Sequence, residues 1–129
     1  MRSKLHDHRL LTPAELELMT ILWAEGPGTV RRVMDSLPVD RQPAYTTVST
    51  ILRILEQKGF VTSRKEGRSH VYGATVERDQ YEGRNLRQLV GSLFGGDPSA
   101  LVRRLVSDES LDQDDLLELQ RIVDERLKP

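Results

Sequence analysis

The sequence predicts a mainly α-helical fold with a small β component: three short helices, one β-hairpin and then a second helical region. Three observations predict it. Apolar residues recur at helical spacing in three segments before residue 59 and in three more after residue 77. Two short runs rich in β-branched and aromatic residues lie between these regions, on either side of a charged tip that contains glycine. Of the 129 residues, 37% are hydrophobic and 30% are charged, as is typical of a folded, helix-rich protein.

The first helix is expected to begin after Thr12. Thr12 is placed to act as the N-cap, Pro13 occupies the first helical position, and Glu15 completes a capping box. Leu11 and Leu16 are spaced to pack on each other across the cap. Gly26-Pro27-Gly28 ends the helix. The stripe expected to face the core consists of Leu16, Met19, Leu22 and Trp23.

Two more helices are expected before the hairpin. A short helix follows Thr29 and ends at Pro38, and residues 40–43 are predicted to form a loop. A longer helix covers residues 44–58, with Gly59 as its C-terminal stop. The expected buried positions are Val30, Val33, Met34 and Leu37 in the short helix and Val48, Ile51, Leu52 and Leu55 in the long one.

The hairpin is predicted to have strands at residues 60–64 and 69–73, joined by a tip at residues 65–68. Three helices followed by a hairpin are typical of a winged helix-turn-helix fold. In that fold the third helix enters the major groove of DNA and the hairpin, or wing, contacts the neighbouring backbone. The sequence therefore predicts a winged domain at residues 10–76, preceded by a flexible N-terminus at residues 1–9.

The exposed face of the third helix favours contact with double-stranded DNA. Its side chains are short and hydrogen-bonding, and such groups can contact phosphates or base edges. Threonine is a poor helix former, so a threonine-rich surface has a local cost that a binding role explains better than solubility does. The candidate contacts are Thr46, Thr47, Ser49, Thr50 and Arg53 on the helix and Lys65 and Arg68 on the wing.

Residues 77–129 are expected to form a helical dimerisation domain. Gly95-Gly96 separates two helices, and Asp97 and Asp112 are placed to cap the second and third. The apolar stripes of these helices have little to cover them in a monomer, so we expect a homodimer, although packing against the winged domain is an alternative. The expected contacts are Leu86, Leu89, Val90, Leu93, Leu101, Val102, Leu105, Leu116, Leu119, Ile122 and Val123.

Charge and composition exclude several classes of protein. Residues 1–76 carry eleven Lys and Arg against eight Asp and Glu, a net charge of +3, whereas residues 77–129 carry a net charge of −4. The chain has no cysteine, which excludes disulfides and thiolate metal sites. No apolar run approaches the roughly 18 residues of a membrane span, and no secretory pattern is present, so we expect a cytoplasmic protein without membrane insertion.

An enzymatic role is not expected. No nucleophile–base pair and no glycine-rich phosphate loop can be named, and no cofactor is predicted. His6 and His8 could bind a metal, but their position near the end of the chain makes a terminal segment the simpler interpretation. We therefore predict no metal site. Two other interpretations of the winged domain remain: a winged-helix regulator controlled by a small ligand, and a winged-helix protein-interaction module.

The residues from Leu11 onward resemble the BlaI/MecI (penicillinase repressor) family of bacterial transcriptional regulators. The segments that carry the resemblance are LTPAELELMTILWAEGPGTVRRVM and AYTTVSTILRILEQKGFVTSRKEGRSHVY, followed at lower specificity by LVGSLFGGDPSALVRRLVSDESL. The spacing of Glu15, Met19 and Trp23 adds to its specificity. The resemblance implies a homodimeric repressor that binds a dyad-symmetric operator.

The resemblance also implies roles for particular residues. It assigns the DNA contacts to the third-helix positions named above, although Ser49 stands where well-known members have a large basic residue. Members of the β-lactam branch are cleaved in the dimerisation helices by a membrane-bound sensor metalloprotease. The matching position here is the bond between Arg104 and Leu105, where both residues differ from the Asn-Phe of that branch. Copper-responsive relatives use a C-terminal cysteine cluster, which this chain lacks.

Overall fold

A computed structural model describes residues 10–129, so His6 and His8 lie outside the described residues. The chain divides into two compact units, the first ending at Leu86 and the second covering Arg87–Pro129. The first unit therefore extends beyond the boundary expected at residue 76. The additional residues belong to the start of α4 (Arg78–Leu93), where Tyr81 is buried in the core of the first unit.

Helix α1 (Pro13–Glu25) begins as the sequence predicts. The Thr12 hydroxyl accepts a hydrogen bond from the backbone of Glu15, and the Glu15 side chain accepts one from the backbone of Thr12. The stripe expected for this helix is partly wrong, because Leu16 is 36% exposed. The helix turns so that its buried residues are Glu15, Leu18, Met19 and Leu22.

Helix α2 (Val30–Asp35) is capped by Thr29, whose hydroxyl accepts from the backbone N–H of Arg32 at 3.1 Å. A 3₁₀ helix (Val39–Arg41) occupies part of the segment expected to be a loop. Helix α3 (Tyr45–Gln57) buries three residues of its predicted stripe, while the fourth is only partly buried. The buried residues are Val48, Leu52 and Leu55, and the partly buried one is Ile51.

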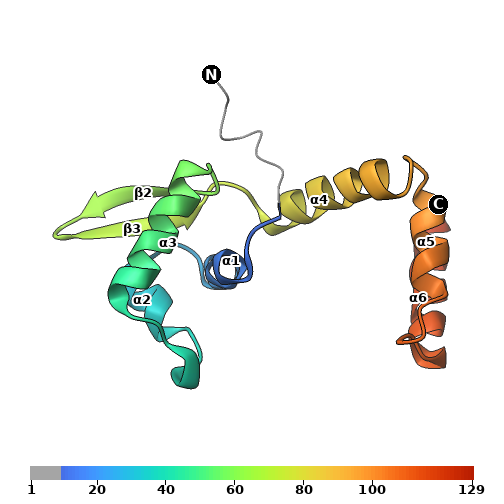
Figure 1. Cartoon of the computed structure of the whole chain (residues 1–129), viewed down its shortest axis with the longest axis horizontal. Coiled ribbons are helices and arrows are strands. Elements are labelled where there is room, and N and C mark those ends of the chain that lie inside the picture. The colour runs from blue at the N-terminus through green and yellow to red at the C-terminus, as the bar shows by residue number, and fades with distance from the viewer. Residues whose placement is uncertain (1–9) are drawn as a thin grey trace. The chain divides into compact units, whose positions relative to one another are not determined.

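The sheet has three antiparallel strands in the order β1-β3-β2, one more than the sequence predicts. The extra strand β1 (Gly28–Thr29) pairs with β3 (Ser69–Ala74), which also pairs with β2 (Val61–Glu66). Figure 1 shows the hairpin of β2 and β3 extending past α3. Its tip is shorter than expected, because Glu66 pairs with Ser69 and only two residues form the turn. Lys65 therefore lies in a strand and not in the tip.

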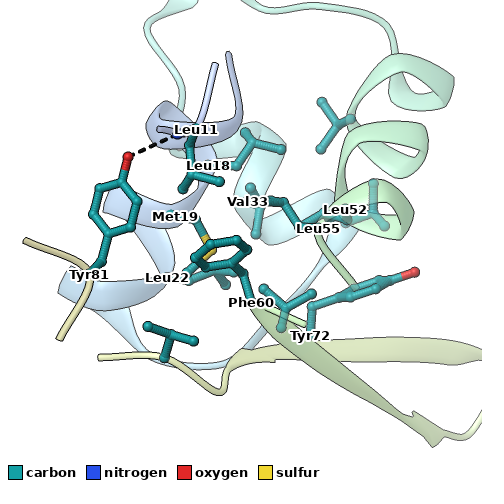
Figure 2. Packing of buried hydrophobic residues seen from close by; sticks show 14 of the residues in the cluster. Leu11, Leu18, Met19, Leu22, Val33, Leu52, Leu55, Phe60, Tyr72 and Tyr81 are labelled. Atoms are coloured by element: carbon teal, nitrogen blue, oxygen red, sulfur yellow. Dashed lines mark hydrogen bonds between the residues drawn. The ribbon is translucent and has the colours of Figure 1, made fainter. Parts of the chain in front are cut away.

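The core of the first unit lies between α1, α2, α3 and the sheet (Figure 2). In this view Phe60 lies next to Met19 and Leu22 of α1, and Tyr81 lies on the α1 side of the core. The Tyr81 hydroxyl accepts a hydrogen bond from the backbone N–H of Leu11 at 2.9 Å. Its ring lies 5.7 Å from that of Trp23 and 6.0 Å from that of Phe60. The start of α4 is thus an integral part of the winged domain.

The second unit is helical. Besides the end of α4 it contains α5 (Pro98–Val106) and α6 (Gln113–Leu127), and the predicted caps Asp97 and Asp112 are both confirmed. No residue of α5 or α6 is buried in the single chain. Over residues 10–129, no helix combines the length and the apolar character that crossing a membrane requires.

Candidate nucleic-acid interface

The outward face of α3 carries the side chains that the sequence singles out. Thr46, Thr47, Thr50 and Arg53 are exposed and Ser49 is partly exposed. The Arg53 guanidinium donates a hydrogen bond to the Thr50 hydroxyl at 3.4 Å, which joins the two side chains on one face. The opposite face of the helix is buried, so the backbone under these residues is held by the core.

The wing adds two exposed cations, Lys65 on β2 and Arg68 in the turn. Arg64 is different, because its guanidinium pairs with the Glu66 carboxylate at 2.7 Å. Within the described part of the chain, no carboxylate lies within ion-pair distance of Arg53, Lys65 or Arg68. These three charges are therefore available to a ligand.

A hollow of about 150 Å³ lies between the start of α2, the face of α3 and strand β3. It brings the predicted contacts Ser49 and Arg68 together with residues that sequence reasoning missed. The missed residues with polar side chains include Arg31, Tyr45 and His70. Arg31 and His70 lie far from Ser49 in the chain, so their only sequence signal is their residue type, whereas Tyr45 lies one helical turn before Ser49 on α3. The full lining is Thr29, Val30, Arg31, Tyr45, Ser49, Arg68, Ser69, His70 and Tyr72.

Two lining residues, Arg31 and Tyr72, have neighbours that affect what the hollow can bind. The guanidinium of Arg31 lies over the ring of Tyr45, 5.6 Å from its centroid, which links α2 to the first turn of α3. Burial and the nearby carboxylate of Glu56 raise the pKa of Tyr72, outweighing the opposing effect of Arg53. The Tyr72 hydroxyl therefore stays protonated at neutral pH and can donate a hydrogen bond.

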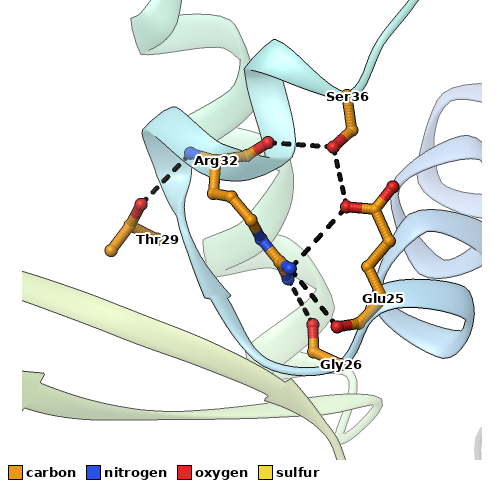
Figure 3. A network of polar contacts seen from close by, with 5 residues as sticks. All are labelled: Glu25, Gly26, Thr29, Arg32 and Ser36. Carbon is orange, nitrogen blue, oxygen red and sulfur yellow. Dashed lines mark hydrogen bonds and ion pairs between the residues drawn. The ribbon is translucent and has the colours of Figure 1, made fainter.

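The side chain of Arg32, on α2, links this helix to the end of α1 (Figure 3). The guanidinium of Arg32 donates hydrogen bonds to the backbone carbonyls of Gly26 and Glu25 and pairs with the Glu25 carboxylate at 3.6 Å. The same carboxylate accepts from the Ser36 hydroxyl at 2.8 Å. These contacts tie the end of α1 to Arg32 within α2 and to Ser36 at the end of α2.

A second polar contact positions α3. The Glu15 carboxylate, at the start of α1, pairs with the Lys58 ammonium, at the end of α3, at 2.9 Å. Burial of the Glu15 carboxylate would by itself raise its pKa, but the hydrogen bonds from Lys58 and the Thr12 backbone outweigh it. The pKa of Glu15 consequently lies below its ordinary value, and the carboxylate is charged at neutral pH.

The apolar residues proposed for dimerisation are at least partly exposed in the single chain. The exposed fraction is 51% for Leu86, 50% for Val102 and 49% for Ile122. Arg104 and Leu105 lie near the C-terminal end of α5 and are exposed as well. In the described residues, no cluster of His, Asp or Glu has the arrangement of a metal site.

Comparison with known proteins gives matches along nearly the whole chain. A sequence model of the penicillinase repressor family matches residues 11–125. The methicillin resistance regulatory protein MecI of Mammaliicoccus sciuri is 24% identical over 116 residues, 90% of this chain and 94% of the relative. The transcriptional regulator BlaI of Mycobacterium tuberculosis is 39% identical over 67 residues, 51% of this chain and 49% of the relative.

Solved structures agree with the sequence comparison. The solution structure of the DNA-binding domain of the repressor BlaI is 27% identical, with a TM-score of 0.51, and covers 63% of this chain and 94% of that one. The fold predicted from the sequence is thus confirmed: mostly helical, with a winged helix-turn-helix and a small antiparallel sheet. Because the family match covers well over half of its residues, the chain belongs to the penicillinase repressor (BlaI/MecI) family of winged-helix regulators.

Proposed function

We propose that this protein is a homodimeric transcriptional repressor that binds a dyad-symmetric operator in double-stranded DNA. The chain is not an enzyme, because its family consists of transcriptional repressors. The observation that carries the proposal is the outward face of α3, where short hydrogen-bonding side chains and Arg53 stand beside a cationic wing. The similarity to a DNA-binding domain of BlaI supports it. Since a repressor acts where the chromosome is, we propose the cytoplasm as its location.

In this proposal the α3 face reads base edges and the wing contacts phosphates. The side chains of Thr46, Thr47, Ser49 and Thr50 offer hydroxyls to phosphates or bases, and the threonine methyl groups can meet thymine. Arg53 can pair with guanine in the major groove. Lys65 and Arg68 are placed to neutralise phosphates, a contribution that does not depend on sequence.

The test compares Arg53→Ala with Lys65→Ala on two duplexes, one selected by the wild-type protein from a random pool and one scrambled. Arg53→Ala should weaken binding to the selected duplex by about 1–3 kcal/mol and leave the scrambled duplex nearly unaffected. Lys65→Ala should weaken both equally and flatten the salt dependence. Fluorescence anisotropy titrations at several salt concentrations measure both effects. Absence of any salt-dependent DNA binding by the wild type would instead favour a protein-interaction module.

The homodimer is proposed from the second unit and from Leu86, the residue of α4 that directly precedes it. Its helices present apolar side chains to solvent and bury none of them in α5 or α6. If half of the proposed contact side chains are buried on association, at about 1.5–3 kcal/mol each, the gross gain is on the order of 10 kcal/mol before association costs. The proposed contacts are Leu86, Leu89, Val90, Leu93, Leu101, Val102, Leu105, Leu116, Leu119, Ile122 and Val123.

Release of the operator is proposed to occur by cleavage between Arg104 and Leu105. Both residues are exposed near the C-terminal end of α5, where a helix frays more readily than at its centre. A cut there would separate α6 from the rest of the chain and weaken the dimer without touching α3. The proposed partner is a membrane-bound sensor metalloprotease. If a sensor metalloprotease is encoded beside the repressor, incubation with it should give one cut at this bond, and an uncut chain would reject the mechanism.

A further inference from the structure

The hollow between α3 and the wing has the chemistry of a site for one phosphate group. The residues that line it carry two guanidinium groups, an imidazole and the hydroxyls of Ser49, Ser69 and Tyr72, and none of them is Asp or Glu. Most of these groups can donate hydrogen bonds to an anion. A buried water needs about 10–15 Å³ of such space, so a hollow of about 150 Å³ has room for a phosphate group.

The two arginines of the hollow come from different elements of the fold. Arg31 approaches from α2, where its guanidinium lies over Tyr45. Arg68 approaches from the turn of the wing. Across residues 10–129, neither has a carboxylate within ion-pair distance. Two cations on the walls of a hollow that no Asp or Glu lines repel each other, and an anion bound there would lower that cost.

Ser49 keeps the hollow open. It is partly buried, lies on the α3 face and is one of the lining residues. A longer side chain at this lining position would take up part of the hollow. The short side chain therefore leaves the floor of the hollow to a ligand.

We propose that this hollow binds a single backbone phosphate of the operator, held between Arg31 and Arg68 above Ser49. The inference rests on the proposed function and deepens it, because it assigns Arg31 and Tyr45 to the DNA interface. A phosphate at this place would contact α2, α3 and the wing at once. It would therefore fix the wing relative to α3 on the duplex. Tyr45 acts as a positioning residue, since its ring supports the guanidinium of Arg31.

The first experiment compares Arg31→Ala with Arg84→Ala, which removes the same charge from α4, outside the hollow. Arg31→Ala should weaken binding to the selected and the scrambled duplex by the same factor, about tenfold, and lower the salt slope by about one. Arg84→Ala should leave both nearly unchanged. Arg31→Lys should recover part of the loss, because it keeps the charge and loses the planar fork. Thermal melts verify that each variant is folded.

The second experiment locates the phosphate. Methylphosphonate groups, which carry no charge, replace one phosphate at a time in the selected duplex. One position per half-site should weaken the wild type about tenfold and have little further effect on the Arg31→Ala/Arg68→Ala double variant. Ser49→Met, which fills the hollow without changing the charge, should lose more affinity for both duplexes than Ser49→Ala, which removes only the hydroxyl.

The outcomes separate the inference from the proposed function. If the wild type binds DNA and Arg31→Ala binds equally well, the inference fails and the repressor proposal stands. A loss confined to the selected duplex would assign Arg31 to base reading and overturn the phosphate site. If no methylphosphonate position weakens the wild type more than it weakens the Arg31→Ala/Arg68→Ala variant, the hollow does not hold a backbone phosphate and the inference fails. A wild type that binds no DNA would overturn both.

Discussion

At the scale of single residues, Glu15 shows how one buried carboxylate serves two contacts. It closes the capping box with Thr12 and pairs with Lys58 at the end of α3. The capping contact needs only an acceptor, so glutamine can replace glutamate there. The contact with Lys58 needs the charge. A single substitution can therefore separate the cap from the ion pair.

Glu15→Gln should lower the free energy of unfolding by about 1–3 kcal/mol at pH 7, because Lys58 loses a largely buried anionic partner. The pKa of Glu15 in the folded protein lies below its ordinary value of 4.5. The stabilising contribution is therefore complete above about pH 4.5 and is lost as pH falls through the folded pKa. The difference in the free energy of unfolding between the wild type and Glu15→Gln should therefore disappear over that pH range.

Urea unfolding at several pH values measures this gap. The matched control is Glu17→Gln, on the same helix, where the partner Arg41 is 61% exposed and little stability should be lost. A gap that stays constant down to about pH 3 would contradict the role assigned to the charge.

Residues of the hollow mark the limit of sequence reasoning at this scale. The candidate contacts on α3 can be predicted because they share one face of a periodic helix. Arg31 and His70 cannot, because they reach Ser49 only when α2 and β3 fold against α3. The spacing of these residues along the chain does not indicate that they lie close together in the fold. The sequence shows that Ser49 replaces the large basic residue of well-known family members, but it does not show the hollow that Ser49 lines.

At the scale of elements, caps and breaks can be predicted more accurately than buried faces. Thr12, Asp97 and Asp112 all cap the helices expected of them. These signals are local, so the residues nearby suffice to read them. Strand β1 escapes prediction because a two-residue strand is too short to show alternation. The expected face of α1 is wrong at Leu16, because the buried position there is that of its neighbour Glu15, which pairs with Lys58 of α3, and a contact between distant segments cannot be read from local spacing.

The junction between β1 and α2 depends on Gly28. A Cβ atom there would collide with the guanidinium of Arg32, which donates hydrogen bonds to the backbone carbonyls of Glu25 and Gly26. Gly28 also pairs with Tyr72 of β3, so the backbone cannot move away freely. The strand and the arginine contacts therefore require a residue without a side chain at this position.

Gly28→Ala should lower the free energy of unfolding by about 1–3 kcal/mol, because the guanidinium must leave its acceptors to make room. Gly91→Ala is the matched control, since a Cβ there meets nothing within 4 Å and alanine favours the interior of α4. Thermal unfolding measures both. In an Arg32→Ala background the added cost of Gly28→Ala should largely disappear, and an undiminished cost would show that Arg32 is not its cause.

At the scale of the whole molecule, the two units divide the proposed work. The winged domain has a closed core that includes the start of α4. The second unit has amphipathic helices without a buried residue in α5 or α6. One winged domain makes few contacts with DNA, and two joined domains bind a dyad with a high effective concentration. The second unit would therefore control affinity without taking part in reading the sequence.

This division predicts the effect of a charge placed on the second unit. Ile122→Glu should abolish the homodimer, because its side chain is 49% exposed in the single chain and would be buried on association. The winged domain should remain folded and bind a half-site duplex as the wild type does. Affinity for a full dyad should fall by about 10²–10⁴-fold, since the second domain no longer binds as part of the same molecule.

Gln120→Glu is the matched control, because it adds the same charge at an exposed polar position of α6. It should keep the wild-type mass in sedimentation equilibrium and the wild-type affinity in anisotropy titrations on the full dyad. An Ile122→Glu protein that stays dimeric would show that this part of α6 lies outside the interface. If it is monomeric but binds the dyad as tightly as the wild type, the second unit does not control affinity, and contacts of the single winged domain must account for binding.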